Sequence, residues 1–442
     1  MEAKSHDSSS LAVPLIVDEK KHLLGRKLEE VESDVACPTT TTTTSFFTTC
    51  FHGLNALSGV GILSVPYALA SGGWLSLIPL FLISCASFYS ALLIQRCMEA
   101  DSDIRTYPDI GERAFGSTGR LVVSVFMYIE LYLVATGFLI LEGDNLQNLF
   151  PNVEFEIAGV TISGKQGFII IVALVILPSV WLDNLSLLSY VSATGVVASA
   201  IILGSIIWTG AFDGIGFHQK GTLLNLNGIP TAVSLYAFCY CAHPVFPTLY
   251  NSMKKKHQFS NVMLLCFILC TFSYASMAIC GYLMFGSSVE SQITLNLPIE
   301  KLSATVAIYT TLVNPIAKYA LMVTPIVNAI RSRFPYEGKK PFSFVVSTSL
   351  VISTVVVALI VPFFGYLMSL VGAFLSIAAS IILPCLCYMK ISGIYQRLCC
   401  EMIVISGITL MGVAVVISEL AFNIFRHEIR TTLGKRHSNP SL

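Results

Sequence analysis

The stretch "ALSGVGILSVPYALASGGW", from Ala56 to Trp74, lies inside the first long apolar segment of the chain. Helices that cross a bilayer are built mainly from leucine, isoleucine, valine and phenylalanine, yet Gly59 and Gly61 stand near the middle of this segment and Pro66 follows them. Glycine weakens a helix because ordering its backbone costs the most entropy, and proline lacks the amide hydrogen that a helix uses. The stretch therefore predicts a membrane helix that is interrupted near its centre.

The composition of the whole chain indicates a membrane protein. Of its 442 residues, 54% are hydrophobic and 12% are charged, whereas about 25% of the residues of a typical soluble protein are charged. Segments of about 20 apolar residues, the length that spans a bilayer, recur along almost the whole chain. The expected fold class is an all-α polytopic membrane protein. The formal net charge is zero, which gives no electrostatic reason to expect a nucleic-acid partner.

The hydropathy pattern predicts three regions. Residues 1–45 are expected to form a disordered cytosolic tail, residues 46–425 an eleven-helix domain, and residues 426–442 a non-cytosolic tail. The predicted spans are 46–70, 74–96, 121–143, 167–183, 188–210, 229–250, 260–285, 303–330, 343–363, 365–389 and 402–425. The eighth is expected to be interrupted by Pro315 and Pro325. Ten or twelve spans stay open as alternatives, because only Pro362 and Gly365 separate the ninth from the tenth.

The distribution of lysine and arginine predicts the orientation. These residues gather in the N-terminal tail and in the loops after spans 2, 6, 8 and 10, whereas the opposite loops hold Lys165, Lys220 and Lys301. This asymmetry places the N-terminus in the cytosol. An odd number of spans then places the C-terminal tail on the lumenal or extracellular side.

A second interrupted span is predicted five spans after the first. Span 6 carries His243, Pro244 and Pro247 near its middle. Many secondary transporters consist of two inverted repeats whose matching helices are broken and hold the substrate at the bilayer midplane, and spans 1 and 6 match in a 5+5 repeat. The alternative is that the glycines of span 1 serve close helix packing and that proline merely kinks span 6.

Four stretches resemble a known family of transporters: "LNALSGVGILSVPYALASGGW", "ELYLVATGFLILEGDNLQNLFP", "WLDNLSLLSYVSATGVVAS" and "HPVFPTLYNSM". They resemble the amino acid/auxin permease family, most closely its plant vacuolar amino acid transporter branch, over roughly residues 45–425. The resemblance implies eleven helices on the leucine-transporter fold, proton-linked movement of amino acids, and an endomembrane location, often the vacuole. Span 6 departs from the family where it reads "YCAHPVFP" in place of a glycine-containing turn, which bears on substrate range.

The candidate substrate site lies at the two interruptions. An amino acid carries an ammonium and a carboxylate group, and the ends of unwound half-helices offer carbonyl groups for the first and amide groups for the second. The candidate residues are Asn55, Ser58, Gly59, Val60 and Gly61 in span 1 and Phe238, Tyr240 and His243 in span 6. We expect a side chain added at Gly61 to intrude on the substrate carboxylate.

Titratable residues inside the spans are candidates for ion coupling, because ionisable groups at this depth are costly and usually functional. Glu130 and His243 are candidate proton carriers. The alternatives are a fixed pairing for Glu130 and a neutral, hydrogen-bonded role for His243 in fastening the broken helix. Glu142 and Asp144 are expected at the membrane edge, solvated or capping.

Lys318 is the most distinctive charged position in the spans. It lies about 20 Å along the helix axis from the cytosolic Arg331, which exceeds the reach of a snorkelling lysine. We therefore expect a buried ammonium group. Sodium-driven relatives on the leucine-transporter fold hold a sodium ion between spans 1 and 8, so an ammonium group there would make transport independent of sodium.

The expected function is secondary active transport of amino acids across an endomembrane, by alternating access and coupled to protons through symport or antiport. The predicted partners are the amino acid, protons and the lipid bilayer, with no cofactor and no metal. The sequence holds no G-x-S-x-G, H-E-x-x-H or P-loop motif, so an enzyme is not expected. Two alternatives stay open: a plasma-membrane permease for auxin or another small organic acid, and a sensor that binds amino acids without moving them.

Overall fold

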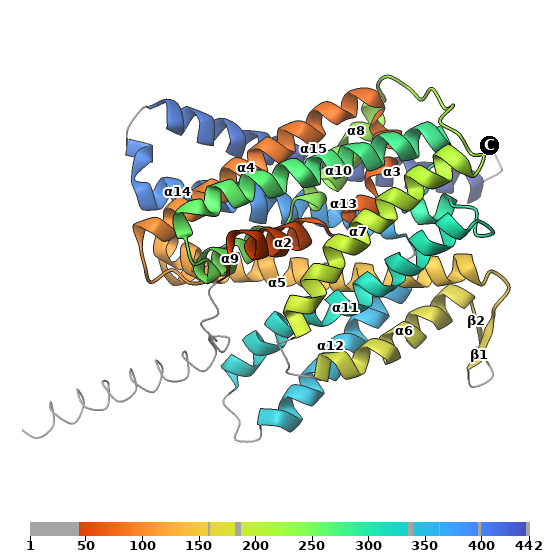
Figure 1. Ribbon diagram of the computed structural model, residues 1–442, viewed down its shortest axis with the longest axis horizontal. Helices are drawn as coiled ribbons and strands as arrows, with labels where there is room; N and C mark the ends of the chain where they lie inside the picture. Colours follow the sequence, from red (N-terminus) through yellow and green to blue (C-terminus); the bar gives the residue numbers. More distant parts are fainter. Residues whose placement is uncertain are drawn as a thin grey trace, which may run out of the picture.

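The computed structural model describes residues 44–157, 160–181, 187–334, 339–361, 363–396 and 399–438. Within these residues, ten helical segments are long and apolar enough to cross a membrane, and they pack side by side into a bundle (Figure 1). The long α-helices are α4 (Leu77–Ala100), α5 (Tyr107–Leu149), α6 (Gly164–Trp181), α7 (Leu187–Phe212), α10 (Phe259–Phe285), α11 (Leu302–Arg333), α12 (Lys339–Ile360) and α15 (Cys400–Ser438). Of the predicted disordered tail, residues 1–43 lie outside the part of the chain that the structure describes.

Exposed apolar side chains on the outside of the bundle are those of a membrane protein. On α10, Ile268 and Phe272 are 57% and 71% exposed, whereas Cys266, Cys270 and Tyr274 on the same helix are buried. A helix that is apolar on its outer face as well as its inner face belongs in lipid rather than water. The protein is a multi-pass helical membrane protein.

The first membrane segment is broken where the sequence predicts. It consists of α2 (Phe46–Leu57), the 3₁₀ turn η1 (Val60–Leu63) and α3 (Val65–Gly72). Between α2 and η1, Ser58 has ψ 69° and Gly59 has ψ −170°, and neither value is helical. The chain therefore leaves the helix for two residues and resumes it.

The predicted span 6 is also broken. It consists of α8 (Ile229–Cys239), the 3₁₀ turn η4 (His243–Val245) and α9 (Phe246–Ser252), and Tyr240 and Ala242 between them are non-helical. Pro244 and Pro247 lie in the first turns of η4 and α9, where a missing amide hydrogen removes no intrahelical hydrogen bond. The two prolines thus begin new helical segments after the break.

The two broken segments run antiparallel beside each other. At one end, the amide of Thr44 donates to the carbonyl oxygen of Ser252 (2.8 Å), and the amide of Lys254 donates to that of Thr44 (3.1 Å). At the other end, the amide of Asn225 donates to the carbonyl oxygen of Gly72 (2.9 Å). Since the start of α2 meets the end of α9 and the end of α3 meets the approach to α8, the two breaks lie near the same depth of the bundle.

Helix α11 corrects one expectation. It is helical from Leu302 to Arg333 and contains both Pro315 and Pro325, so the predicted interruption of span 8 is wrong. Membrane helices tolerate proline where neighbouring helices satisfy the freed backbone groups, and α11 packs against both α7 and α5.

The predicted span 10 is irregular in a way the hydropathy pattern does not show. Between α13 (Phe364–Leu370) and α14 (Leu383–Ser392), the π-helical segments η8 (Val371–Ser376) and η9 (Ala378–Ile382) widen the helix. The η8 segment packs against α5 and α8. Because π-helical turns are frequent at functional sites, η8 is a third irregular backbone element of interest beside the two breaks.

One feature lies outside the all-α expectation. After α5 the strands β1 (Phe155–Ile157) and β2 (Val160–Ile162) form an antiparallel pair in which Phe155 lies opposite Ile162. This small hairpin stands beside α6 at one end of the bundle (Figure 1).

Candidate substrate site

Lys318 of α11 holds the end of α2 at the first break. Its side chain is buried, with 5% of the residue exposed. Nζ donates to the carbonyl oxygens of Ser58 (3.2 Å) and Asn55 (3.4 Å). A cation is favourable at the C-terminus of a helix, where carbonyl groups lack intrahelical partners. The ammonium group thus lies beside span 1, as the sequence predicts, and the snorkelling alternative is excluded.

A glycine on α7 makes room for this contact. A Cβ atom at Gly195 would lie 1.9 Å from Oδ1 of Asn55 and 3.3 Å from Cε of Lys318. Ser58 also faces α7, since its hydroxyl group forms a hydrogen bond with that of Ser199. The side chains of Asn55 and Ser58 therefore lie between α2 and α7.

Two buried polar atoms beside the break have no hydrogen-bond partner within the described part of the chain. They are Oδ1 of Asn55 and the hydroxyl oxygen of Ser64, the residue that precedes α3. Buried polar atoms are nearly always paired, so an unpaired atom marks a place for a ligand or a water molecule. Sequence reasoning missed Ser64, although a serine three residues after Gly61 was a visible signal.

The two glycines of the break have different surroundings. A Cβ atom at Gly61 would lie 2.8 Å from Sγ and 3.3 Å from Cα of Cys239 on α8. Gly61 therefore allows span 1 to approach span 6 closely, and a side chain added there would first meet Cys239; its effect on the substrate carboxylate stays a prediction. No atom lies within 4 Å of a Cβ position at Gly59. Open space at the break thus adjoins Gly59, while Val60 is buried.

Tyr274 on α10 joins the two half-helices. Its hydroxyl group contacts the carbonyl oxygen of Leu57, the last residue of α2, and that of Cys239, the last residue of α8 (3.1 Å). Both carbonyl groups belong to helix ends that lack intrahelical partners. Sequence reasoning missed this residue, because a tyrosine in an apolar span carries no sign of which backbone groups it reaches.

The aromatic candidates of span 6 face different neighbours. Phe238 packs towards Gly61, with its Cδ1 atom 3.4 Å from a Cβ position there. Tyr240 stacks on Phe267 with ring centroids 5.9 Å apart, and its hydroxyl group bonds to Thr271 (2.9 Å). Tyr240 is therefore fixed against α10, and only Phe238 of the pair lies against the first break.

His243 fastens the broken helix to α4. The residue is fully buried, and Nε2 lies 2.8 Å from Oγ of Ser90 and 3.0 Å from the carbonyl oxygen of Ser87. Ser90 in turn donates to the carbonyl oxygen of Ser380 in η9. These contacts tie η4, α4 and η9 together, which favours the anchoring role over that of a proton carrier.

Glu130 of α5 lies at the second break. Only 4% of the residue is exposed, and its Oε1 atom accepts a hydrogen bond from Ser376 at the end of η8 (2.6 Å). The thiol group of Cys241, within the break, is also in hydrogen-bonding reach of the carboxyl group. The structure thus places one charged residue type from a neighbouring helix against each break, Lys318 of α11 at the first and Glu130 of α5 at the second.

Two carboxyl groups of α5 were expected at a solvated membrane edge. Asp144 fits that expectation in part, since it pairs with Lys165 and accepts from Gln292 (3.0 Å). Glu142 does not, because it is fully buried and neither oxygen has a hydrogen-bond partner in the residues described. Its position on the inner face of α5 removes it from water.

Comparison with known proteins places the chain. A family model described as "Transmembrane amino acid transporter protein" matches residues 42–425.

The described residues contain no group of three or more histidine, cysteine, aspartate or glutamate side chains that could hold a metal ion.

Curated relatives agree with the family model. The chain is 63% identical to "Amino acid transporter AVT1J" of Arabidopsis thaliana over 417 residues, which cover 94% of this chain and 97% of the relative. It is 65% identical to "Amino acid transporter AVT1I" of the same plant over 373 residues, which cover 84% and 92%. These relatives are transporters rather than enzymes. The chain therefore belongs to the transmembrane amino acid transporter family, the amino acid/auxin permeases, in its vacuolar-type branch.

Proposed function

We propose that the protein is a proton-coupled secondary transporter that moves amino acids across an endomembrane, the vacuolar membrane, by alternating access. Its family and its relatives support amino acid transport. The observation that carries the mechanistic part is the contact between Lys318 and the broken end of α2.

The substrate binds where the two breaks meet. Asn55, Ser58, Gly59, Val60 and Gly61 form the first break, and the open space beside Gly59 adjoins it. The unpaired oxygens of Asn55 and Ser64 suit the ammonium group of an amino acid, and amide groups at the start of η1 and α3 suit its carboxylate. Phe238 supplies an apolar surface at the same level.

Eleven crossings and a 5+5 inverted repeat follow from the same elements. The broken segment α2–α3 precedes the ten long helical segments, and it is antiparallel to the broken segment α8–α9. In such a repeat α5 and α11 are equivalent third helices. Glu130 on α5 contacts the break of the second repeat, and Lys318 on α11 contacts the break of the first. This correspondence supports the repeat.

The two residues have opposite roles in coupling. Lys318 places a fixed positive charge on the carbonyl groups between spans 1 and 8, where a sodium ion would otherwise be needed, so transport requires no sodium. Glu130 carries the proton, because a carboxyl group can accept and release a proton without leaving the hydrogen bond from Ser376. His243, already held by α4, acts as an anchor.

The proposed orientation has the N-terminus in the cytosol and the C-terminus in the lumen. It is supported by lysine and arginine in the loops after spans 2, 6, 8 and 10. Neither of the two alternatives, a plasma-membrane permease for small organic acids and a non-transporting sensor, is favoured by a contact at the breaks.

Uptake into proteoliposomes with an imposed pH gradient tests this function. The assay uses a panel of labelled amino acids and labelled indole-3-acetate, with liposomes lacking protein as the control. We expect uptake of at least one amino acid that collapses when a protonophore removes the gradient. Uptake of indole-3-acetate alone supports the organic-acid permease, and binding without uptake of any compound supports the sensor.

A further inference from the structure

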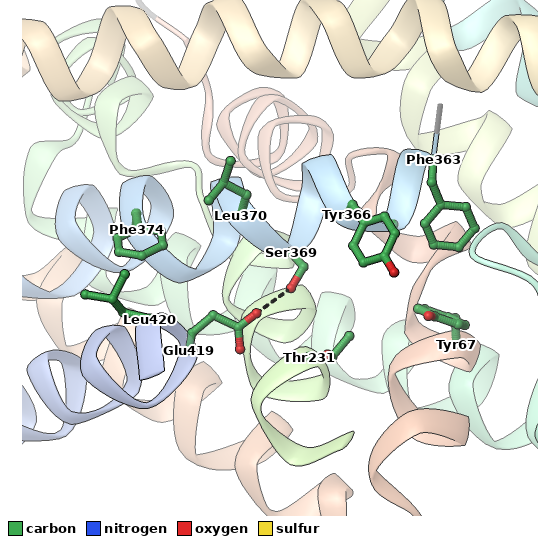
Figure 2. Close-up of a pocket in the computed structure, with 10 residues that line it drawn as sticks. Tyr67, Thr231, Phe363, Tyr366, Ser369, Leu370, Phe374, Glu419 and Leu420 are labelled. Carbon is green, nitrogen blue, oxygen red and sulfur yellow. Dashed lines mark hydrogen bonds between the residues drawn. The ribbon is translucent and has the colours of Figure 1, made fainter. Parts of the chain in front are cut away.

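A cavity of about 390 Å³ lies among five helical elements, α3, α8, α13, η8 and α15, and its lining includes no residue of the two breaks. Tyr67 of α3 and Thr231 of α8 line one side, and residues of α13 line the other. Glu419 and Leu420 of α15 complete the lining. Figure 2 shows the carboxyl group of Glu419 pointing to Ser369, with Thr231 beside it and the rings of Tyr67, Phe363 and Tyr366 at the far end.

The carboxyl group in this cavity is buried. Glu419 is 2% exposed, and its Oε1 atom accepts a hydrogen bond from Ser369 of α13 (3.0 Å). Carboxyl groups within membrane helices are costly and usually functional. Glu419 sits in a long apolar helix that otherwise buries little of its surface, so packing of α15 alone does not require it.

The opposite end of the cavity is aromatic. The ring of Phe363 packs edge-to-face against Tyr67 (6.2 Å) and Tyr366 (5.1 Å). Faces of such rings attract cations, including organic ammonium groups, and a carboxylate forms strong charge-assisted hydrogen bonds with ammonium groups. The two ends of the cavity therefore favour the same kind of ligand.

We propose that this cavity binds an organic ammonium ion at a site separate from the substrate site. The ammonium group contacts Glu419, and its carbon substituents lie against the rings of Tyr67, Phe363 and Tyr366. Because the cavity touches α3 and α8, the half-helices that lie on the same side of the two breaks, its occupant stabilises one arrangement of these elements. The inference does not depend on which substrate is transported. Two sources share this chemistry, a soluble amine or amino acid and the headgroup of an aminophospholipid.

The proposal is tested by measuring the binding of n-butylamine to the full chain in detergent with saturation-transfer NMR. The compound is cationic at pH 7, as a lysine side chain is, while n-butanol and butyrate share its chain without the positive charge. We expect n-butylamine to bind at least about tenfold more tightly than either, and Glu419→Gln to weaken it by about tenfold, the value of a charge-assisted hydrogen bond.

Glu401→Gln is the matched control, because Glu401 is on the same helix but pairs with Arg96 far from the cavity. It should leave n-butylamine binding unchanged. Tyr366→Leu removes an exposed ring and should weaken binding about threefold, which provides a second variant if Glu419→Gln folds poorly. Unchanged affinity in both Glu419→Gln and Tyr366→Leu, or equal binding of n-butanol, overturns the proposal.

Competition identifies the source of the natural ligand. In nanodiscs, displacement of n-butylamine by phosphatidylethanolamine but not by phosphatidylglycerol supports the lipid headgroup. Displacement by free amino acids supports the soluble source. If amino acids displace n-butylamine from Glu419→Gln as well as from the native chain, the compound binds at the breaks and the separate site does not exist.

Discussion

The Nζ atom of Lys318 lies 3.2 Å from the carbonyl oxygen of Ser58, so a lysine on α11 completes the hydrogen bonding of a helix that ends in the middle of the bundle. The same atom reaches Asn55 one turn earlier. A break in a membrane helix leaves carbonyl groups that have no water to bond to. The lysine donates hydrogen bonds to two of them. The side-chain oxygen of Asn55 keeps no hydrogen-bond partner among the described residues.

Removing this charge should abolish transport. Lys318→Met keeps much of the side-chain volume but leaves two buried carbonyl groups unpaired, at a cost of about 1–3 kcal/mol for each. We expect uptake in proteoliposomes to fall at least about tenfold at equal protein content. Lys301→Met, at the exposed N-terminal end of the same helix, is the control and should retain uptake. Full activity of Lys318→Met would show that the lysine is not part of the transport site.

Sodium should not stimulate transport. The ammonium group of Lys318 already occupies the position beside Ser58 that a cation would take, and a second positive charge there would be repelled. Exchange of choline for sodium at constant pH and constant membrane potential should leave the initial uptake rate unchanged. A several-fold increase in that rate contradicts the role given to Lys318.

Coupling of amino acid uptake to the proton gradient should fail without the carboxyl group of Glu130. Glu130→Gln keeps an acceptor for the hydrogen bond from Ser376 but cannot exchange a proton. We expect the pH gradient to lose its effect on uptake, while binding of the amino acid, measured by thermal stabilisation, persists. Glu156→Gln on the exposed hairpin strand serves as control. Gradient-driven uptake in Glu130→Gln rules this residue out as the proton carrier.

The hydroxyl group of Tyr274 should contribute to stability and to the closeness of the two breaks. Tyr274→Phe removes only the oxygen that contacts Leu57 and Cys239, and one lost buried hydrogen bond costs about 1–3 kcal/mol. A lowered thermal midpoint is expected, together with weaker amino acid binding. Tyr309→Phe, in which the parent tyrosine is half exposed, should change neither quantity. A wild-type midpoint for Tyr274→Phe contradicts the bridging role.

The sequence predicted the elements of the site that depend on backbone chemistry. Gly59 and Pro244 weaken a helix locally, so both breaks were predictable from the residues alone. Lys318 was conspicuous because a charge inside an apolar span is rare. Pro315 and Pro325 led to the wrong prediction of an interrupted span 8, because proline alone disfavours a helix locally. The packing of α11 against its neighbours preserves the helix.

The elements that depend on tertiary contacts were not predictable. Gly61 and Gly59 are two residues apart, yet one touches Cys239 and the other open space, and only the placement of α8 decides between them. Tyr240 turned to α10 and His243 to α4 for the same reason. A single sequence fixes which groups are polar but not which helix each one meets.

The most direct test of the account is the ligand-induced thermal stabilisation of Gly59→Val. The backbone angles of Gly59, φ −86° and ψ −170°, suit a β-branched residue, and open space surrounds its Cβ position, so the variant should fold normally while its side chain fills the substrate space. Gly61→Val should instead overpack against α8, which costs about 1–3 kcal/mol of folding free energy. Its thermal midpoint without ligand should therefore fall. Gly204→Val, also in open space and exposed on α7, should behave as wild type.

A saturating amino acid stabilises the native chain by about 2.7 kcal/mol at one hundred times its dissociation constant. The account predicts that Gly59→Val keeps the ligand-free midpoint of the wild type and loses this stabilisation. If Gly59→Val is stabilised by the amino acid as strongly as the wild type, the substrate does not bind at the break of the first helix.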